Sequence, residues 1–109
     1  MGKPVVGDVV VLPFPQTNLL PGKRRPALVV ANLTGDDVIL CQITSQTHRD
    51  SYSIALDVDD FQTGQLNVRS YIRPNRLFTA EHSVIISTAA HVTTPKLDET
   101  LAKLRQLFS

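Results

Sequence analysis

The chain has 109 residues, of which 42% are hydrophobic and 19% are charged. This length suits one domain, which we predict over residues 1–109, and the apolar content supports a packed core and excludes an intrinsically disordered chain. The formal net charge of +1 is almost neutral, so binding of a polyanion would have to depend on a local cationic patch.

Short apolar runs separated by turn residues predict β-strands over most of the chain. A hairpin turn is expected at Thr34–Asp37, and Pro74 indicates a bend or an edge within a longer strand. In chain order, the predicted strands are Val9–Leu12, Ala27–Ala31, Val38–Thr44, Ile54–Val58, Ser70–Phe78 and Val84–Ile86.

The last segment of the chain predicts a helix. Thr94 is a suitable N-cap, and Pro95 suits the first helical position. Apolar side chains at helical spacing are expected to form one buried face: Leu97, Leu101, Leu104 and Phe108. Strands followed by one amphipathic helix predict a mainly β fold, a small and strongly curved antiparallel sheet or barrel with the helix packed on it.

Two of the predicted strands, Val9–Leu12 and Ala27–Ala31, are apolar on both faces. One face could meet a second subunit, or a barrel interior backed by the helix could account for the pattern equally well. The sequence leaves both explanations open.

Cysteine and histidine usage predicts a cytoplasmic protein without a metal site. Cys41 is the single cysteine, so no internal disulfide is expected, and its apolar neighbours predict a buried thiol. The first residues lack the apolar stretch of a signal peptide, and no run reaches the ~18 apolar residues of a membrane span, so we expect a reducing cytoplasm and no membrane. The three histidines have none of the spacings typical of zinc ligands.

Cations gather at the end of the long connection that precedes the second predicted strand. Lys23, Arg24 and Arg25 are consecutive, and Pro26 follows directly. Because the proline and the strand restrict the backbone beside Arg25, its guanidinium is held on a rigid base, which suits a bidentate phosphate ligand. The alternative is an ordinary solvated charge run.

A hydroxyl-rich segment follows the third predicted strand. Thr44 stands at the strand end, where a polar side chain is presented with little conformational freedom, and His48 could titrate near neutral pH. The alternative is a Ser/Thr-rich turn that bonds to its own backbone, with His48 as a surface residue.

A third cluster combines charge with an aromatic ring. Arg69, Tyr71 and Arg73 alternate along the chain and would share one face of a strand. This combination suits single-stranded nucleic acid, and it equally suits an exposed sheet face.

The sequence lacks the signature motifs of several classes of enzyme. No paired carboxylates bracket an evident cleft, and there is no GxSxG, P-loop or GxGxxG motif. A cation and hydroxyls remain, which fits phosphate chemistry on a substrate that brings its own nucleophile, as RNA does in its 2′-hydroxyl.

Several blocks of the sequence, in this order and at this separation, closely resemble the MazF/PemK family of toxin endoribonucleases. The resemblance covers nearly the whole chain, including the closing helix. The blocks are Gly7–Val10 with Pro13–Phe14, Arg24–Val29, Gln42–Ser45 and Ser70–Leu77.

The resemblance implies a small SH3-like β-barrel that forms a homodimer and inhibits growth by cutting single-stranded RNA, such as mRNA, at short motifs. It also implies that no metal or other cofactor is needed and that a cognate antitoxin occupies the RNA groove. Carried over by position, Arg25 and Thr44 are the catalytic pair, and the products are a 2′,3′-cyclic phosphate and a 5′-hydroxyl end. The residues implied to bind RNA are Lys23, Arg24, Ser45, Gln46, His48, Arg73, Asn75 and Arg76.

Physical reasoning assigns the roles of this pair only in part. Arg25 can hold a phosphate, but a guanidinium stays protonated and makes a poor base, while the Thr44 hydroxyl can only form hydrogen bonds. The acceptor of the 2′-proton is therefore open between His48 and water. One departure from the family, His91–Thr93 in place of a Gly-Leu turn, concerns the entry to the helix and not the site.

Two other functions remain open at this level. Because no general base is evident, the chain could be a non-catalytic SH3-like module that binds RNA or a peptide. It could also be a structural subunit that pairs with itself through its apolar strands.

Overall fold

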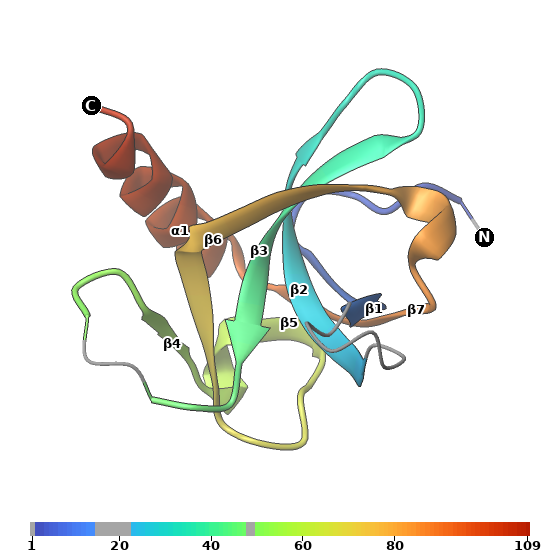
Figure 1. The fold of residues 1–109 in the computed structure, drawn as a ribbon. Coiled ribbons are helices and arrows are strands. Elements are labelled where there is room, and N and C mark those ends of the chain that lie inside the picture. Colours follow the sequence, from blue (N-terminus) through green and yellow to red (C-terminus); the bar gives the residue numbers. More distant parts are fainter. Residues whose placement is uncertain (1, 15–22, 48–49) are drawn as a thin grey trace.

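The computed structural model describes residues 2–14, 23–47 and 50–109. In this part of the chain, antiparallel strands form a 7-stranded sheet in the order β4-β6-β3-β2-β1-β7-β5, which curves into a half-barrel (Figure 1). The strands are β1 (Asp8–Phe14), β2 (Lys23–Asn32), β3 (Asp37–Thr44), β4 (Ile54–Leu56), β5 (Phe61–Gly64), β6 (Ser70–Glu81) and β7 (Ser87–Val92). The helical elements are the 3-10 helices η1 (Val58–Asp60) and η2 (His82–Val84) and the α-helix α1 (Thr94–Leu107). The predicted mainly β fold with a C-terminal helix is confirmed.

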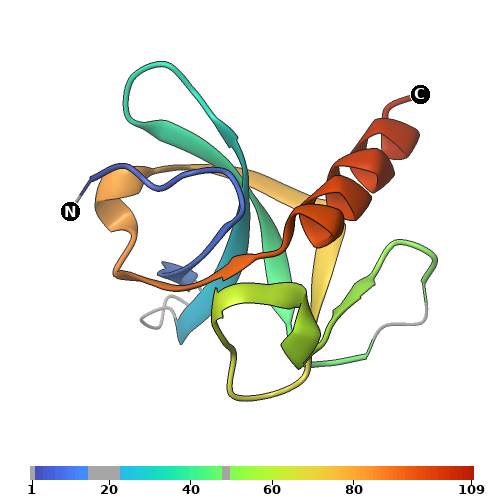
Figure 2. The same cartoon turned by 180° about the vertical axis from the view of Figure 1, so that it is seen from behind.

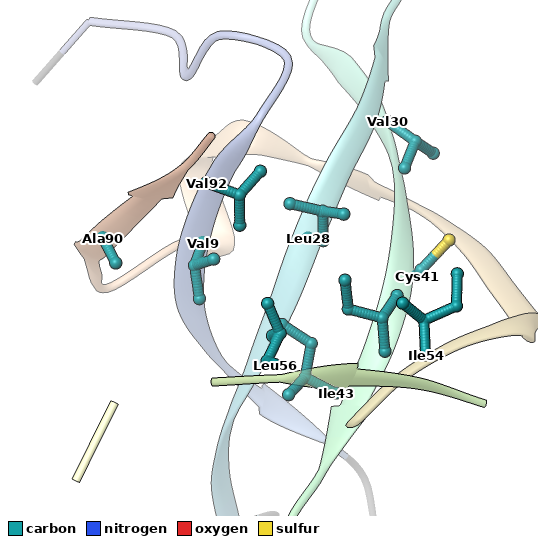
Figure 3. Close-up of a cluster of buried hydrophobic side chains, with 10 residues drawn as sticks. Val9, Leu28, Val30, Cys41, Ile43, Ile54, Leu56, Ala90 and Val92 are labelled. Atoms are coloured by element: carbon teal, nitrogen blue, oxygen red, sulfur yellow. The ribbon is translucent and has the colours of Figure 1, made fainter. Parts of the chain in front are cut away.

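One face of the sheet carries the larger hydrophobic core. Val9 of β1, Leu28 of β2 and Cys41 of β3 are fully buried there, and Figure 3 shows their side chains on neighbouring strands. Ile54 and Leu56 of the edge strand β4 also belong to this cluster, so the curved sheet wraps its edge around the core. The burial predicted for Cys41 is confirmed, and it raises the pKa of the thiol to about 12, which makes this cysteine a poor nucleophile.

The helix α1 covers this core, on the side of the sheet away from the N-terminus (Figure 2). Its apolar residues Leu97, Leu101 and Leu104 pack against the cluster, as their spacing predicts. The prediction that Phe108 shares this face is wrong, because the helix ends at Leu107 and the Phe108 side chain is 77% exposed. The N-cap is Thr93 rather than Thr94, since helical geometry already begins at Thr94.

The opposite face of the sheet is also buried within the chain. Val10, Leu12 and Val29 belong to a second cluster on that face. The side chains that pack against this cluster come from strand ends and from the segment after η2: Phe14, Phe78, Ala80 and Ile85. The two-sided apolar character of the first two predicted strands is therefore accounted for by two cores within one chain.

Some predicted boundaries differ from the structure. Val84–Ile86 is not a strand, because Val84 ends the 3-10 helix η2 and the next two residues only connect it to β7, which is the last strand. The predicted strand at Ile54–Val58 ends at Leu56, because Val58 begins η1. β5 was not predicted, since its residues Gln62–Gly64 have no apolar alternation and pairing with β7 places them in the sheet.

β6 contains the bend that Pro74 indicates. Gln42 of β3 pairs with Arg73, whereas the preceding Cys41 pairs with Leu77. The residues Pro74–Arg76 therefore form a bulge, where the missing N–H of proline costs no ladder hydrogen bond.

The entry to α1 is well held even though His91–Thr93 departs from the family pattern. His91 Nδ1 lies 2.8 Å from Asp8 Oδ1, and the N–H of Val92 donates to the Gly7 carbonyl at 3.0 Å. The N–H of Thr93 donates to the Asp60 carbonyl at 2.8 Å. These bonds join the start of the helix to β1 and to η1.

Candidate active site

A cavity of about 380 Å³ opens where β2 begins and β3 ends. The connection between β5 and β6 forms its other wall. Its described lining residues are Lys23, Arg24, Arg25, Pro26, Ile43, Thr44, Ser45, Leu66, Asn67, Val68 and Ser70. Both members of the expected catalytic pair are thus in one cavity, although they are distant in the sequence.

Strand pairing explains why Arg25 and Thr44 meet. β2 and β3 run antiparallel with Ala27 opposite Gln42. Continuing this register by two residues places Arg25 opposite Thr44, and the period of two along a strand keeps both on the same sheet face as Ala27 and Gln42. The cavity also receives Pro26 and Ile43 from the other face because it lies at the strand ends.

Arg25 lies inside β2, where it pairs with Leu12 of β1, and its neighbour Pro26 pairs with Val11. The strand thus begins earlier than the sequence predicts, at Lys23 rather than at Ala27. The Arg25 side chain is exposed. The sheet therefore holds the backbone of Arg25 while its guanidinium is accessible to a ligand, as expected from the proline and the strand that follow it.

Thr44 is oriented by a local turn. Its Oγ1 accepts a hydrogen bond from the backbone N–H of Gln46 at 3.1 Å, an arrangement typical of a Ser/Thr turn. The hydroxyl hydrogen remains available for a phosphate oxygen. The Ser/Thr turn that the sequence offers as the alternative to a binding role is therefore present. It leaves the hydroxyl hydrogen of Thr44 available to a ligand.

The charged residues of the cavity all have the same sign. Lys23, Arg24 and Arg25 contribute three cations, and no Asp or Glu is among the described lining residues. Such a concave, single-sign surface concentrates anions, although the chain as a whole is nearly neutral.

The remaining residues expected to bind RNA are distributed over three places. Ser45 lines the cavity, and Gln46 is exposed beside it. Asn75 is exposed in the β6 bulge. Arg76 lines a second cavity, and His48 lies outside the described residues.

Arg73 holds a loop instead of lining the cavity. Its side chain is 14% exposed, and its Nη2 lies 3.3 Å from Asp50 Oδ2 in the connection between β3 and β4. Asp50 also accepts the backbone N–H groups of Tyr52 and Ser53 at 2.9 Å and 3.0 Å. These backbone bonds, followed by smaller contributions from the Ser53 hydroxyl and Arg73, hold the pKa of Asp50 below its ordinary value.

The second cavity, of about 340 Å³, is lined by Pro13, Phe14, Gln42, Arg76, Leu77 and Phe78. The rings of Phe14 and Phe78 meet edge to face, with centroids 5.1 Å apart. Gln42 connects this second cavity to the first one, because Gln42 lies two residues before Thr44 on the same face of β3.

The wall formed by Leu66, Asn67 and Val68 was not found from the sequence. These residues belong to no motif, and only the antiparallel return of the chain into β6 brings them opposite β2. Their composition carries no signal that could have identified them.

Tyr71 lies on β6 beside the site, and Arg69 directly precedes this strand. Tyr71 pairs directly with Thr44, and its hydroxyl lies 3.4 Å from Thr47 Oγ1. The guanidinium carbon of Arg69 lies 5.9 Å from the centre of the Tyr71 ring, and Arg69 Nε lies 3.2 Å from Asp57.

Within residues 2–14, 23–47 and 50–109, no group of three His, Cys, Asp or Glu side chains is arranged to hold a metal ion. None of the helices in these ranges combines the length and the apolar character that crossing a bilayer requires.

Comparison with known proteins identifies the family. Residues 6–108 match the family described as the PemK-like, MazF-like toxin of type II toxin-antitoxin systems. No curated protein sequence matched the chain.

Solved structures share the fold. MazF from Deinococcus radiodurans is 25% identical, with a TM-score of 0.76 over 99% of this chain and 98% of that one. An endoribonuclease from a mycobacterial species is 16% identical, with a TM-score of 0.75 over 99% and 93%. A mycobacterial endoribonuclease in complex with its cognate antitoxin is also 16% identical, with a TM-score of 0.73 over 96% and 94%. Because the family match spans almost the whole described chain, this protein belongs to the PemK-like, MazF-like toxins of type II toxin-antitoxin systems.

Proposed function

We propose that this chain is a sequence-specific endoribonuclease that cleaves single-stranded RNA, mRNA in particular, without a metal ion. The 2′-hydroxyl attacks the adjacent phosphorus, and the products are a 2′,3′-cyclic phosphate and a 5′-hydroxyl end. The observation that supports this most is the meeting of Arg25 and Thr44 in one cavity whose described charged lining is entirely cationic. Structural relatives described as endoribonucleases add support at the level of the family.

The roles of the pair follow from their chemistry. Arg25, on a backbone fixed by β1, holds the scissile phosphate with its planar fork of donors and stabilises the charge that develops on the phosphorane. Thr44 donates its hydroxyl hydrogen to a phosphate oxygen or binds the 2′-oxygen. With the substrate held in line, the protein supplies orientation and charge while the RNA supplies the nucleophile.

The neighbouring residues bind the rest of the strand. Lys23, Arg24 and Ser45 contact the phosphates next to the scissile one, since they line the same cavity. Arg76, beside Phe14 and Phe78 in the second cavity, is placed to bind a flanking nucleotide. Gln46 and Asn75 offer amides that can read base edges.

A cleavage assay in EDTA tests the proposal. The purified chain is incubated with a long single-stranded RNA, and its fragments are mapped. We expect discrete fragments with a cyclic phosphate at the 3′ end and a 5′ end that a polynucleotide kinase can phosphorylate. A matched RNA with a 2′-deoxynucleotide at each mapped cut should remain intact, because it lacks the nucleophile.

The same assay distinguishes the alternative function, a non-catalytic SH3-like module that binds RNA or a peptide. An intact RNA that is retained by the protein would favour the module and overturn the enzyme. No affinity for RNA at low salt, where phosphate contacts are strongest, would favour a purely structural subunit.

We further propose that the chain is a cytoplasmic homodimer that inhibits growth and is neutralised by a cognate antitoxin. Leu77, Val84 and Ile86 remain exposed near the second cluster and are candidates for contact with a second copy. The cationic cavity suits an acidic antitoxin segment, and one structural relative was solved with its cognate antitoxin. Sedimentation of the purified chain and growth after its induction, with and without the neighbouring reading frame, test these points.

A further inference from the structure

The proposed reaction needs a proton donor that neither member of the Arg25–Thr44 pair supplies well. When the bond between phosphorus and the 5′-oxygen breaks, that oxygen must take up a proton to leave as a hydroxyl. A guanidinium gives up its proton too reluctantly, and a threonine hydroxyl is too weak an acid. Another titratable side chain on the same face of the sheet would supply this proton more readily.

We propose that Tyr71 is this general acid and that its hydroxyl protonates the leaving 5′-oxygen. The proposal rests on the endoribonuclease function proposed above and names a further catalytic residue for it. In the step, the bond from the 2′-oxygen to phosphorus forms while the bond to the 5′-oxygen breaks. The Tyr71 proton moves to the 5′-oxygen, the 2′-proton leaves to water, and water returns a proton to the phenolate.

The sheet places Tyr71 on the far side of Thr44 from Arg25. Tyr71 is the direct cross-strand partner of Thr44 in the β3–β6 ladder, and facing residues of an antiparallel pair have Cβ atoms about 4.5–5.5 Å apart. Arg25 is opposite Thr44 on the other flank by the extended β2–β3 register. With strands about 4.8 Å apart, the row Arg25–Thr44–Tyr71 spans about 10 Å, which is wide enough to hold one phosphodiester between its ends.

The contacts of the Tyr71 side chain hold its hydroxyl near the turn that begins at Thr44. Its hydroxyl lies 3.4 Å from the hydroxyl of Thr47, in the segment that directly follows the cavity residue Ser45. The ring is half-buried, so its position is restrained while the hydroxyl end can still be reached.

Two arginines lie near Tyr71 in the chain. Arg73 follows Tyr71 by two residues on the same face of β6, and Arg69 lies two residues before Tyr71, just ahead of this strand. The guanidinium carbon of Arg69 lies 5.9 Å from the ring centre while its Nε lies 3.2 Å from Asp57, and Arg73 is paired with Asp50. From the edge strand β4, the residue opposite Tyr71 is the uncharged Ala55. Tyr71 therefore stands beside two ion pairs, with its ring next to the Arg69 guanidinium.

A pair of RNA substrates tests the role of the hydroxyl. Once the cleaved motif is mapped with wild type, two short RNAs carry that motif, one with the natural 5′-oxygen at the cut and one with sulfur in its place. A thiolate leaves without prior protonation, because thiols have pKa values near 8.5. We expect Tyr71→Phe to slow cleavage of the oxygen substrate by about 10²–10⁴-fold and to leave cleavage of the sulfur substrate within about threefold of wild type.

The variant keeps the aromatic ring, so RNA affinity should not change if the hydroxyl alone is lost. Tyr52→Phe, which alters the other tyrosine of the chain, is the matched control and should cleave both RNAs at the wild-type rate. Equal slowing of Tyr71→Phe on both substrates, or none on either, would overturn the role of Tyr71. If wild type cleaves neither RNA, the proposed function itself fails and this inference fails with it.

A second measurement does not depend on how the Phe variant folds. Because the chain has two tyrosines, biosynthetic incorporation of fluorotyrosine into Tyr52→Phe modifies Tyr71 alone. Fluorine makes the phenol more acidic, so the alkaline decline of the cleavage rate on the oxygen substrate should move to lower pH. An unmoved decline would contradict the assignment.

Discussion

Replacement of Arg25 by alanine separates catalysis from folding. The side chain is exposed, and the backbone pairing of Arg25 with Leu12 does not depend on it, so the free energy of unfolding should change by no more than about 0.5 kcal/mol. For a domain of this size, that corresponds to a shift of the melting temperature by about 2–4 °C. Loss of one preorganised group that stabilises transition-state charge should slow cleavage about 10²–10³-fold, or about 2.7–4 kcal/mol.

Single-turnover cleavage of a mapped RNA measures the effect, with thermal unfolding followed on the same sample. Arg25→Lys retains the charge but lacks the planar fork, and its rate should lie between wild type and Arg25→Ala. Arg24→Ala is the matched control, because Arg24 lines the same cavity but points to the other face of β2. It should weaken binding and reduce the salt slope by about 0.7 while leaving the bound RNA to be cut at a near-normal rate.

Two results would refute the assignment of Arg25. One is near-normal cleavage by Arg25→Ala when the RNA is saturating. The other is an equal loss of cleavage in Arg24→Ala, which would mean that charge near the cavity matters and position does not.

The remaining predictions concern the framework of the site. Asp50→Ala should release the β3–β4 connection, seen as faster amide exchange at Tyr52 and Ser53. Since its pKa is lowered on folding, the Asp50 carboxylate stabilises the chain at neutral pH and this contribution is lost as the pH falls below about 4, so melting temperatures of wild type and Asp50→Ala should converge in acid. Gly64→Ala should disrupt β5–β7 pairing, measured as lost amide protection in β5, because φ is +68° and the new Cβ would lie 2.2 Å from the Ala89 carbonyl oxygen. Leu28→Ala, at a fully buried site, should cost about 2–5 kcal/mol in urea unfolding.

Local patterns in the sequence predict much of the sheet. The apolar runs at β1, β2 and β3 mark strands because each buries side chains on a core, and the amphipathic spacing of Leu97, Leu101 and Leu104 marks the helix. Pro74 indicates the bulge in β6 because proline cannot donate to the ladder. β5 could not be predicted, since its few polar residues become a strand only by pairing with β7.

The candidate site, like the sheet, can be predicted from the sequence only in part. A rigid arginine before a proline and a threonine at a strand end are visible as residue types that suit phosphate chemistry. The sequence also predicts Arg73 as an RNA ligand, and the structure adds that its guanidinium meets Asp50, a contact between a strand and a loop that no periodicity predicts.

By itself, the sequence determined most of the strands, the helix and which side chains have the chemistry to bind a phosphate, because these depend on near neighbours along the chain. The tertiary structure alone decided that Thr44 shares a cavity with Arg25 and pairs with Tyr71 on the neighbouring strand. Register is set by how whole strands bury their faces, so a shift of one residue would have turned these three side chains to different sides of the sheet.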